Sequence, residues 1–266
     1  MTKVGVLGAA GKVGRLVCRA VAEDSELRLV AGIDPPHAGE PIGAMVGLSG
    51  VTLKVSDDLM TLVQAEAEVV VDFTQPDQVL ENVRWAIDRG IHVVVGTTGV
   101  GPDEQERIRS WIEAEGGESN VIVAPNFSIG AVVAERLAEQ AARYFPAVEI
   151  VELHHDQKLD APSGTASAAA SRIASAREEA WSGPSGDERV AGVRGGEVDS
   201  IRVHSIRLPG LVAHHEFLFG GPGQMLTIRH DTMDRASFVP GVLLAIREVV
   251  KRPGLTVGLE PLLGLD

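Results

Sequence analysis

The sequence has a single cysteine and a single tyrosine among 266 residues, and only 4% of its residues are aromatic. One cysteine excludes a disulfide within the chain. No apolar run approaches the about 20 residues that a helix needs to cross a bilayer. The chain starts at Met1-Thr2-Lys3 and enters a strand-like segment without a cleavable apolar leader. We therefore expect a cytoplasmic protein that has no membrane partner.

Basic residues are also scarce, with 24 Lys and Arg against 37 Asp and Glu and a formal net charge of −13. Proteins that bind nucleic acids need clustered cations for phosphate contacts, so we expect no nucleic-acid partner. An anionic ligand would require a local group of basic side chains. Hydrophobic residues make up 44% of the chain, which is enough for the core of one large domain or of two ordinary ones.

Several catalytic and metal-binding motifs are missing. The chain has neither HExxH nor CxxC, and its Ser163 lies outside the Gly-x-Ser-x-Gly pattern of serine hydrolases. Tyr144 is followed four positions later by Val148, which excludes the Tyr-x-x-x-Lys pair of short-chain dehydrogenases. Cys18 lies in the first predicted helix, where a packed apolar role is expected rather than that of a semialdehyde-dehydrogenase nucleophile. We expect no metal site.

A glycine-rich turn follows the first predicted strand. Residues 3–7 form that strand, and a helix opens within the glycines from Gly8 to Gly14. A second predicted strand, residues 27–33, ends at Asp34, where a carboxylate can bind an adenine-ribose hydroxyl. The alternative is an ordinary glycine-rich turn with an exposed acid. The pattern favours a dinucleotide site made by Gly8, Ala9, Ala10, Gly11, Lys12, Val13 and Asp34.

Strands and helices then alternate as in a Rossmann-type α/β fold with a doubly wound parallel sheet. We predict strands over 51–55, 69–73, 92–95 and 121–124, and helices over 57–65, 76–89 and 102–115. Ligands of such sheets bind beyond the carboxyl ends of the strands. The segments that reach this edge contain Phe73, Gly96, Thr97, Thr98, Ala124, Pro125, Asn126 and Phe127.

The second half of the chain predicts a smaller α+β domain for substrate binding and oligomerisation. We place this domain at 128–237 and the dinucleotide-binding domain at 1–127, completed by 238–266. Predicted helices span 128–143, 165–180 and 238–251, and predicted strands span 147–155, 201–208, 212–219 and 224–230. Turns between the last three strands suit antiparallel neighbours. We expect the loop 181–200 to be mobile and to fold over substrate. His204, His214, His215 and His230 are interpreted as sheet or interface residues.

The segment EIVELHHDQKLDAPSGTA, residues 149–166, concentrates the candidate chemistry. Its strand delivers His154 and His155, which point to opposite faces, so at most one is expected to face a substrate. Lys158 supplies a cation. Ser163, Gly164 and Thr165 then begin a helix, whose free N–H groups favour a carboxylate or phosphate. The segment predicts a proton donor, a cation and an anion site within one loop.

These motifs resemble the 4-hydroxy-tetrahydrodipicolinate reductase family, also called dihydrodipicolinate reductase, over essentially the whole chain. The resemblance rests on GAAGKVG, VDFTQP, GTTG, APNFSIG and above all the segment 149–166. It implies an NADH- or NADPH-dependent oxidoreductase of diaminopimelate and lysine biosynthesis that reduces 4-hydroxy-tetrahydrodipicolinate, a small dicarboxylate. It also implies a homotetramer whose substrate domains pack sheet to sheet. By this resemblance, His154 is the proton donor, Lys158 a second catalytic cation, and His155, Gly164 and Thr165 substrate ligands.

Two positions depart from the family pattern. Gln157 stands where many members have a third histidine, and Asp34 is followed by Pro35 and Pro36 rather than by an arginine. Lys12 is therefore the one basic residue expected near a 2′-phosphate, unless it is simply solvated. We expect NADH to be used at least as well as NADPH. The alternative functions are another two-domain nicotinamide-dependent oxidoreductase and a non-catalytic dinucleotide-binding redox sensor.

Overall fold

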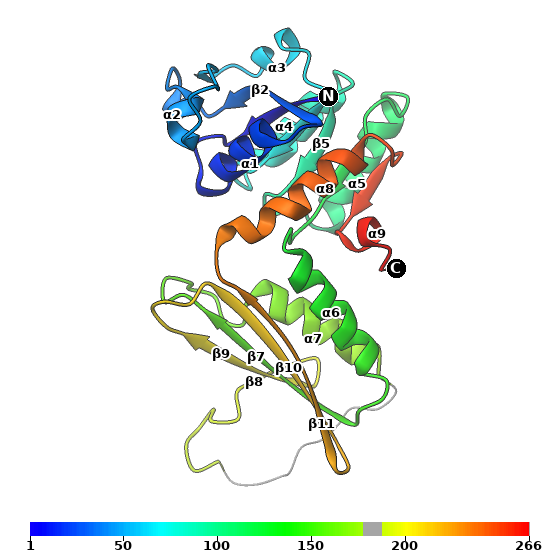
Figure 1. The fold of residues 1–266 in the computed structure, drawn as a ribbon. Helices are drawn as coiled ribbons and strands as arrows, with labels where there is room; N and C mark the ends of the chain where they lie inside the picture. Colours follow the sequence, from blue (N-terminus) through cyan, green and yellow to red (C-terminus); the bar gives the residue numbers. More distant parts are fainter. Residues whose placement is uncertain (178–187, 266) are drawn as a thin grey trace. The chain divides into compact units, whose positions relative to one another are not determined.

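The computed structural model describes residues 1–177 and 188–265, which divide into two compact units (Figure 1). Unit 1 contains Met1–Phe127 and the chain from Arg235 onward, and unit 2 is Ser128–Asp234. The sequence places the return to unit 1 at residue 238. The last residues of the predicted helix 165–180 and the first part of the predicted mobile loop lie outside the described residues.

Unit 1 is built on a parallel sheet of seven described strands in the order β12-β6-β5-β4-β1-β2-β3. Its central strands are valine runs buried on both faces, the composition typical of parallel sheets covered by helices on each side. The doubly wound fold predicted from the alternating pattern is therefore confirmed. The strands are β1 (Thr2–Leu7), β2 (Leu27–Ile33), β3 (Val55–Ser56), β4 (Val69–Asp72), β5 (His92–Val95), β6 (Val121–Val123) and β12 (Leu255–Val257).

Helices cover both faces of this sheet (Figure 1). α1 packs beside α8 in one layer, and α4 packs beside α5 in the other. The α4–α5 layer buries residues such as Val83 and Ile108 against strand residues such as Val70 and Val93. The helices are α1 (Lys12–Glu23), α2 (Ile42–Val46), α3 (Met60–Gln64), α4 (Val79–Ile87), α5 (Pro102–Ala114), α8 (Val239–Val249) and α9 (Glu260–Leu263), with 3₁₀ turns η1 (Pro35–His37) and η2 (Arg235–Phe238).

Unit 2 is a mixed sheet of five described strands in the order β11-β10-β7-β9-β8. β10 and β11 are antiparallel neighbours as predicted, but β9 and β10 are not neighbours. β7 lies between them, parallel to β9 and antiparallel to β10, because its alternating apolar residues extend the same buried face on both sides. The strands are β7 (Ala147–His154), β8 (Gly196–Val198), β9 (Ile201–Arg207), β10 (Ala213–Gly221) and β11 (Gln224–Thr232).

One face of the unit 2 sheet is covered by α6 (Ile129–Ala141) and α7 (Gly164–Ser175) (Figure 1). Alanines on both helices allow them to pack closely on the sheet, where Ile150, Phe217 and Phe219 are fully buried. Strand alternation directs Glu152 and His154 to this same helix-covered face. The polar side chains of Glu152 and His154 therefore lie beside the start of α7.

The predicted boundaries failed mainly for short elements. The strand expected over 51–55 is reduced to β3, and β8 lies within a segment predicted to be a loop. The tail contributes β12 to the edge of the unit 1 sheet, beside β6. In the described part of the chain, no helix combines the length and the apolar character that crossing a membrane requires.

Candidate active site

The glycine turn of unit 1 brings its backbone very close to α1. Gly8 has a φ of +72°, and a Cβ added at Gly14 would lie 2.0 Å from the carbonyl oxygen of Gly8. Both positions therefore require glycine. The Gly11 N–H donates to the Gly8 carbonyl at 3.0 Å, and α1 begins at the next residue, Lys12. The turn thus presents backbone at a helix N-terminus, as a pyrophosphate site requires.

Asp34 follows β2 and is tied to this turn. Its Oδ2 accepts a hydrogen bond from the Ala10 N–H at 3.0 Å, and its Oδ1 lies 2.8 Å from Nδ1 of His37. A carboxylate has about four lone-pair sites, so these two contacts leave acceptor capacity for ribose hydroxyls. The position fits the role that the sequence predicts for Asp34.

A cavity of about 660 Å³ lies over the turn. The charged residues that line it are Asp34, Asp57 and Glu81, all acidic, whereas Lys12 is exposed and is not among its lining residues. Its size and its glycine and carboxylate walls fit the adenosine part of a dinucleotide. The remaining lining residues are Leu7, Gly8, Gly11, Ile33, Pro35, Pro36, Leu59, Phe73, Thr74, Gln75, Gln78, Asn82 and Trp85.

The ends of β4, β5 and β6 also meet at this edge. The rings of Phe73 and Phe127 are 5.9 Å apart, and a Cβ at Gly96 would fall 2.2 Å from the Phe73 ring. Thr97 donates a hydrogen bond to the Asp72 carboxylate at 2.9 Å. The structure therefore brings Phe73, Gly96, Thr97 and Phe127 together. Of the predicted cofactor residues, four line the cavity over the glycine turn, namely Gly8, Gly11, Asp34 and Phe73. The others do not, namely Ala9, Ala10, Lys12, Val13, Gly96, Thr97, Thr98, Ala124, Pro125, Asn126 and Phe127.

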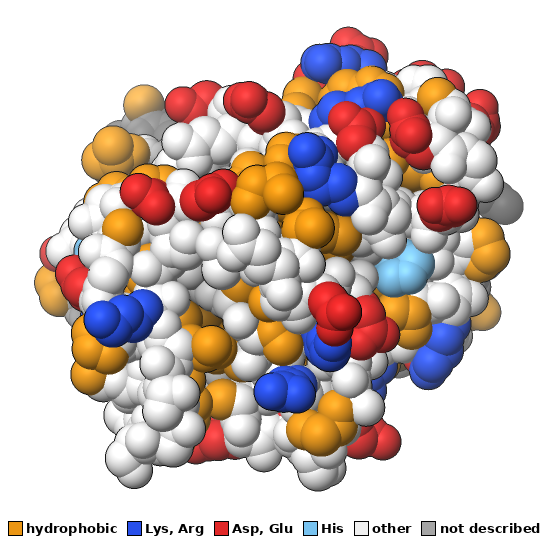
Figure 2. Space-filling model, turned by 90° about the horizontal axis from the view of Figure 1, so that it is seen from above, with side chains coloured by type: hydrophobic (Ala, Val, Ile, Leu, Met, Phe, Trp, Pro, Cys, Tyr) orange, Lys and Arg blue, Asp and Glu red, His pale blue; other side chains and the backbone are white. Residues whose placement is uncertain are grey.

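Figure 2 views the molecule from above and shows acidic side chains spread over the face, with basic ones among them. On that face the basic side chains do not form a continuous surface. A phosphate-bearing ligand would depend on the backbone groups of the glycine turn rather than on a field of cations.

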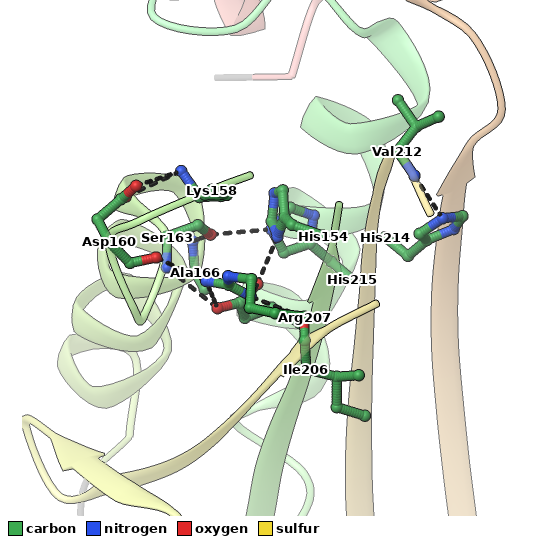
Figure 3. Close-up of polar contacts among 11 residues, drawn as sticks. His154, Lys158, Asp160, Ser163, Ala166, Ile206, Arg207, Val212, His214 and His215 are labelled. Carbon is green, nitrogen blue, oxygen red and sulfur yellow. Dashed lines mark hydrogen bonds and ion pairs between the residues drawn. The ribbon is translucent and has the colours of Figure 1, made fainter. Parts of the chain in front are cut away.

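In unit 2, His154 is held by a buried carboxylate. Its Nδ1 is hydrogen-bonded to Oε2 of Glu152, whose side chain is fully buried. Arg207 binds the same carboxylate with both terminal nitrogens, at 2.9 Å to Oε2 and 2.8 Å to Oε1. The Ser163 N–H donates to Oε1 at 3.3 Å. Glu152 thus links β7, β9 and the start of α7. Figure 3 shows His154, Arg207 and Ser163 close together.

The protonation states of Glu152 and His215 follow from their surroundings. Burial alone would raise the pKa of Glu152, but hydrogen bonds from His154 and Arg207 outweigh it and hold that pKa well below its ordinary value of 4.5. His215 lies on β10 with its ring 5.5 Å from that of His154. Burial, together with the neighbouring His154, lowers the pKa of His215 to about 4. At neutral pH the site therefore holds an ionised Glu152 and a neutral His215.

Lys158 and the helix start complete the loop that the sequence singles out. The Lys158 ammonium is paired with both carboxylate oxygens of Asp160, at 2.9 and 2.8 Å (Figure 3). Ser163 caps α7 as predicted, because its Oγ accepts from the Ala166 N–H at 3.1 Å. A Cβ added at Gly164 would meet no atom within 4 Å, so there is open space beside the first turn. The enclosed Nδ1 of His155 has no hydrogen-bond partner in the described part of the chain.

Three residues of this cluster were missed by the sequence analysis. Glu152 precedes His154 by two positions, and residues two apart on a strand share a face, so its proximity was predictable. Arg207 reaches Glu152 through the register of β7 with β9, which places His154 opposite it. His215 was interpreted only as a sheet or interface residue, yet it lies beside His154. No local pattern marks either of these two partners.

The structure also bears on the excluded chemistries. Cys18 is fully buried, and burial raises the pKa of its thiol to about 12, so it is a packed residue and not a nucleophile. Tyr144 lies in the turn after α6 and is 81% exposed. Neither residue takes part in the cluster around His154.

Comparison with known proteins decides the family. The model described as "Dihydrodipicolinate reductase, N-terminus" matches residues 2–127, and the model described as "Dihydrodipicolinate reductase, C-terminus" matches residues 130–263. The chain belongs to the dihydrodipicolinate reductase family. This membership confirms the predicted enzyme class, an oxidoreductase of diaminopimelate and lysine biosynthesis that uses NADH or NADPH.

Individual dihydrodipicolinate reductases are similar over the whole chain. Proteins named 4-hydroxy-tetrahydrodipicolinate reductase from Nocardia farcinica and from a Mycobacterium species are each 50% identical to it, with 99% of both chains covered. A dipicolinate-bound dihydrodipicolinate reductase from Paenisporosarcina sp. TG-14 superposes with a TM-score of 0.86 and 39% identity, covering 98% of this chain and 99% of that one. An amine dehydrogenase from Mycobacterium smegmatis, at 13% identity and a TM-score of 0.64, shares the fold alone.

Proposed function

We propose that the protein reduces 4-hydroxy-tetrahydrodipicolinate to tetrahydrodipicolinate, with His154 as the proton donor. The observation that carries this assignment is the bond between Nδ1 of His154 and the buried Glu152 carboxylate. Because the Glu152 carboxylate is ionised, it accepts this hydrogen bond and Nδ1 of His154 is the donor. Because Nδ1 is engaged, Nε2 is the ring nitrogen that can deliver a proton to substrate.

Arg207 prevents the Glu152 carboxylate from taking a proton from His154. Its two hydrogen bonds hold Glu152 ionised and fixed in orientation, so that His154 cannot transfer its proton inward. Loss of the 4-hydroxyl group as water gives a cyclic unsaturated imine. The His154 proton is then available to the ring nitrogen of that imine, where negative charge develops as the ring is reduced. NADH or NADPH supplies the hydride for that reduction when it is bound.

The substrate is proposed to bind through its carboxylates. One of them fits the first turn of α7, where Gly164 and Thr165, directly after the Ser163 cap, present N–H groups beside open space. Lys158 lies in the same loop and can exchange its contact with Asp160 for a substrate carboxylate. The enclosed Nδ1 of His155, which has no hydrogen-bond partner among residues 1–177 and 188–265, is available for a further contact. The dipicolinate bound to the Paenisporosarcina relative supports a planar dicarboxylate ligand.

The proposed cofactor residues are those of unit 1. The glycine turn would hold the pyrophosphate, Asp34 the adenosine ribose, and the segments at the ends of β4, β5 and β6 the remainder. The cavity over the turn supports this assignment, because its dimensions and its acidic and backbone groups fit a ribose with free hydroxyls. We assign dinucleotide binding to unit 1 and substrate binding to unit 2.

A coupled assay tests the function directly. Aspartate semialdehyde and pyruvate are condensed by the preceding synthase, and the loss of reduced-cofactor absorbance is followed after the protein is added. We expect turnover with wild-type protein and none when the synthase is omitted. Cofactor binding without turnover would indicate a redox sensor, and turnover of an unrelated ketone or imine alone would indicate another oxidoreductase.

We also propose that the protein is a cytoplasmic homotetramer. The face of the unit 2 sheet opposite α6 and α7 carries Val151, Leu153, Ile206 and Leu218, all only partly buried. Apolar side chains on an uncovered sheet face favour association with another copy. Light scattering at micromolar concentration should give four times the mass of one chain, and a monomer mass would contradict the proposal.

A further inference from the structure

Asp72 is a fully buried acidic side chain for which the proposed chemistry has no use. It is the last residue of β4, directly before the Phe73-Thr74 turn. An ionised group placed there without partners would be strongly destabilising. Asp72 must therefore be compensated by its neighbours, and those neighbours are the residues that form the cofactor edge.

Its oxygens accept hydrogen bonds from three separate segments. Oδ1 accepts from the Thr74 N–H at 2.8 Å, the Thr74 hydroxyl at 2.7 Å and the Thr97 hydroxyl at 2.9 Å. Oδ2 accepts from the Asn82 amide at 2.9 Å. Thr74 belongs to the turn after β4, Thr97 to the turn after β5, and Asn82 to α4. The carboxylate is thus the point at which these segments are joined.

The backbone of Asp72 extends the same connection. Its carbonyl oxygen accepts the Gly96 N–H at 2.9 Å and is 3.2 Å from the Thr97 hydroxyl. Gly96 in turn lies against the Phe73 ring, where no side chain could fit. Asp72 therefore fixes the turn after β4 and the turn after β5 relative to each other. A shift of either turn would break several of the hydrogen bonds to Asp72 at once.

The direction of these bonds also matters. A threonine hydroxyl has one proton, and in both threonines that proton points at Asp72. The hydroxyl oxygens are left with lone pairs only, and that of Thr74 also accepts from the Asn82 amide at 3.2 Å. Neither hydroxyl can therefore donate a hydrogen bond to a ligand. An amide at position 72 would present a donor to at least one of these groups and would disturb this polarity.

We infer that Asp72 is a positioning residue for dinucleotide binding, which holds the turns after β4 and β5 in their binding arrangement. It contacts no reacting atom and acts through Thr74, Thr97 and Asn82. The inference rests on the proposed use of NADH or NADPH. It predicts a weaker affinity for the cofactor, with little change in the chemical step once the cofactor is bound.

The test compares NADH dissociation constants, measured by fluorescence titration, for wild type, Asp72→Asn, Thr97→Val and the double variant. We expect Asp72→Asn to weaken NADH binding about tenfold, the usual scale for a lost charged hydrogen bond. KM for NADH should rise in parallel, while kcat at saturating NADH changes much less. The double variant should be no weaker than Asp72→Asn alone, because both changes break the same network.

Val83→Ala is the matched control, because Val83 is fully buried on the same helix as Asn82. It should lower the melting temperature without changing NADH affinity. Wild-type affinity in Asp72→Asn, or a loss of affinity in Val83→Ala equal to that in Asp72→Asn, would overturn the inference. If Asp72→Asn does not fold, Thr74→Val and Thr97→Val decide, since each removes one donor and unaltered NADH affinity in both would overturn it. Failure of wild-type protein to bind either cofactor would overturn the proposed function as well.

Discussion

Asp72 and Glu152 are both fully buried carboxylates in the carboxyl-terminal parts of strands, but their partners differ in kind. Asp72 accepts hydrogen bonds only from neutral hydroxyl, amide and backbone groups among the described residues. Glu152 is bound by the Arg207 guanidinium and the His154 ring. Neutral donors fix the geometry of loops, whereas charged partners can also hold a proton in place. The same functional group therefore serves architecture in unit 1 and, in the proposed mechanism, acid chemistry in unit 2.

Replacing the proposed proton donor should give the largest effect. His154→Ala or Lys158→Ala should lower kcat about a hundredfold or more, the scale of general acid–base groups. NADH affinity should be unchanged, because the proposed cofactor residues lie in unit 1. Lys251→Ala, which alters an exposed lysine of unit 1, is the control for loss of a cation. Near-normal turnover in His154→Ala would show that the His154–Glu152 pair does not supply the proton.

Breaking the charged network should mainly cost stability. Arg207→Met leaves Glu152 buried without its strongest partner, and breaking such a pair typically costs about 3–5 kcal/mol. Urea unfolding measures this difference. Arg19→Met breaks an exposed pair with Glu23, and the free energy of unfolding should change by no more than about 1 kcal/mol. Equal effects of the two substitutions would show that the buried pair with Glu152 contributes no more to stability than an exposed pair.

Acid should destabilise unit 2 in two steps. His215 has a folded-state pKa of about 4, below its ordinary 6.5, so the unfolded chain binds a proton first and stability falls as pH drops from 6.5 to 4. At pH 5 this amounts to about 1–2 kcal/mol. The lowered pKa of Glu152 adds a further loss below pH 4.5. Melting temperatures against pH should show the first step flattened in His215→Gln, and an unchanged profile would contradict the burial argument.

Cofactor choice should show the smallest effect. The cavity over the glycine turn is lined by Asp34, Asp57 and Glu81, which disfavour a 2′-phosphate, so NADH should be used at least as well as NADPH. Comparison of kcat/KM for the two cofactors measures this. Lys12→Ala should reduce use of NADPH alone if that lysine reaches the phosphate. A preference for NADPH above about tenfold, or ~1.4 kcal/mol, would show that cations outside the cavity dominate.

Local patterns predicted the parts of the molecule that depend on local geometry. The turn from Gly8 to Gly14, the acid at Asp34 and the Ser163 cap all follow from residue types at fixed spacings. Strands of three residues, such as β8 and β12, are too short to show alternation and were missed. The order β10-β7-β9 and the pairing of Arg207 with Glu152 depend on long-range register, which no single segment encodes. The cluster around His154 was therefore found only in part.

The return of the chain to unit 1 has a consequence for synthesis from the N-terminus. β12 pairs with β6, and α8 packs beside α1, so unit 1 is completed by residues made after all of unit 2. Until then, one edge of the parallel sheet and one apolar helix face stay uncovered. During synthesis, unit 1 therefore stays incomplete while unit 2, which is inserted in its sequence, can already fold. Proteolysis of stalled nascent chains should find unit 2 protected before unit 1, and the reverse order would argue that the sheet closes without its last strand.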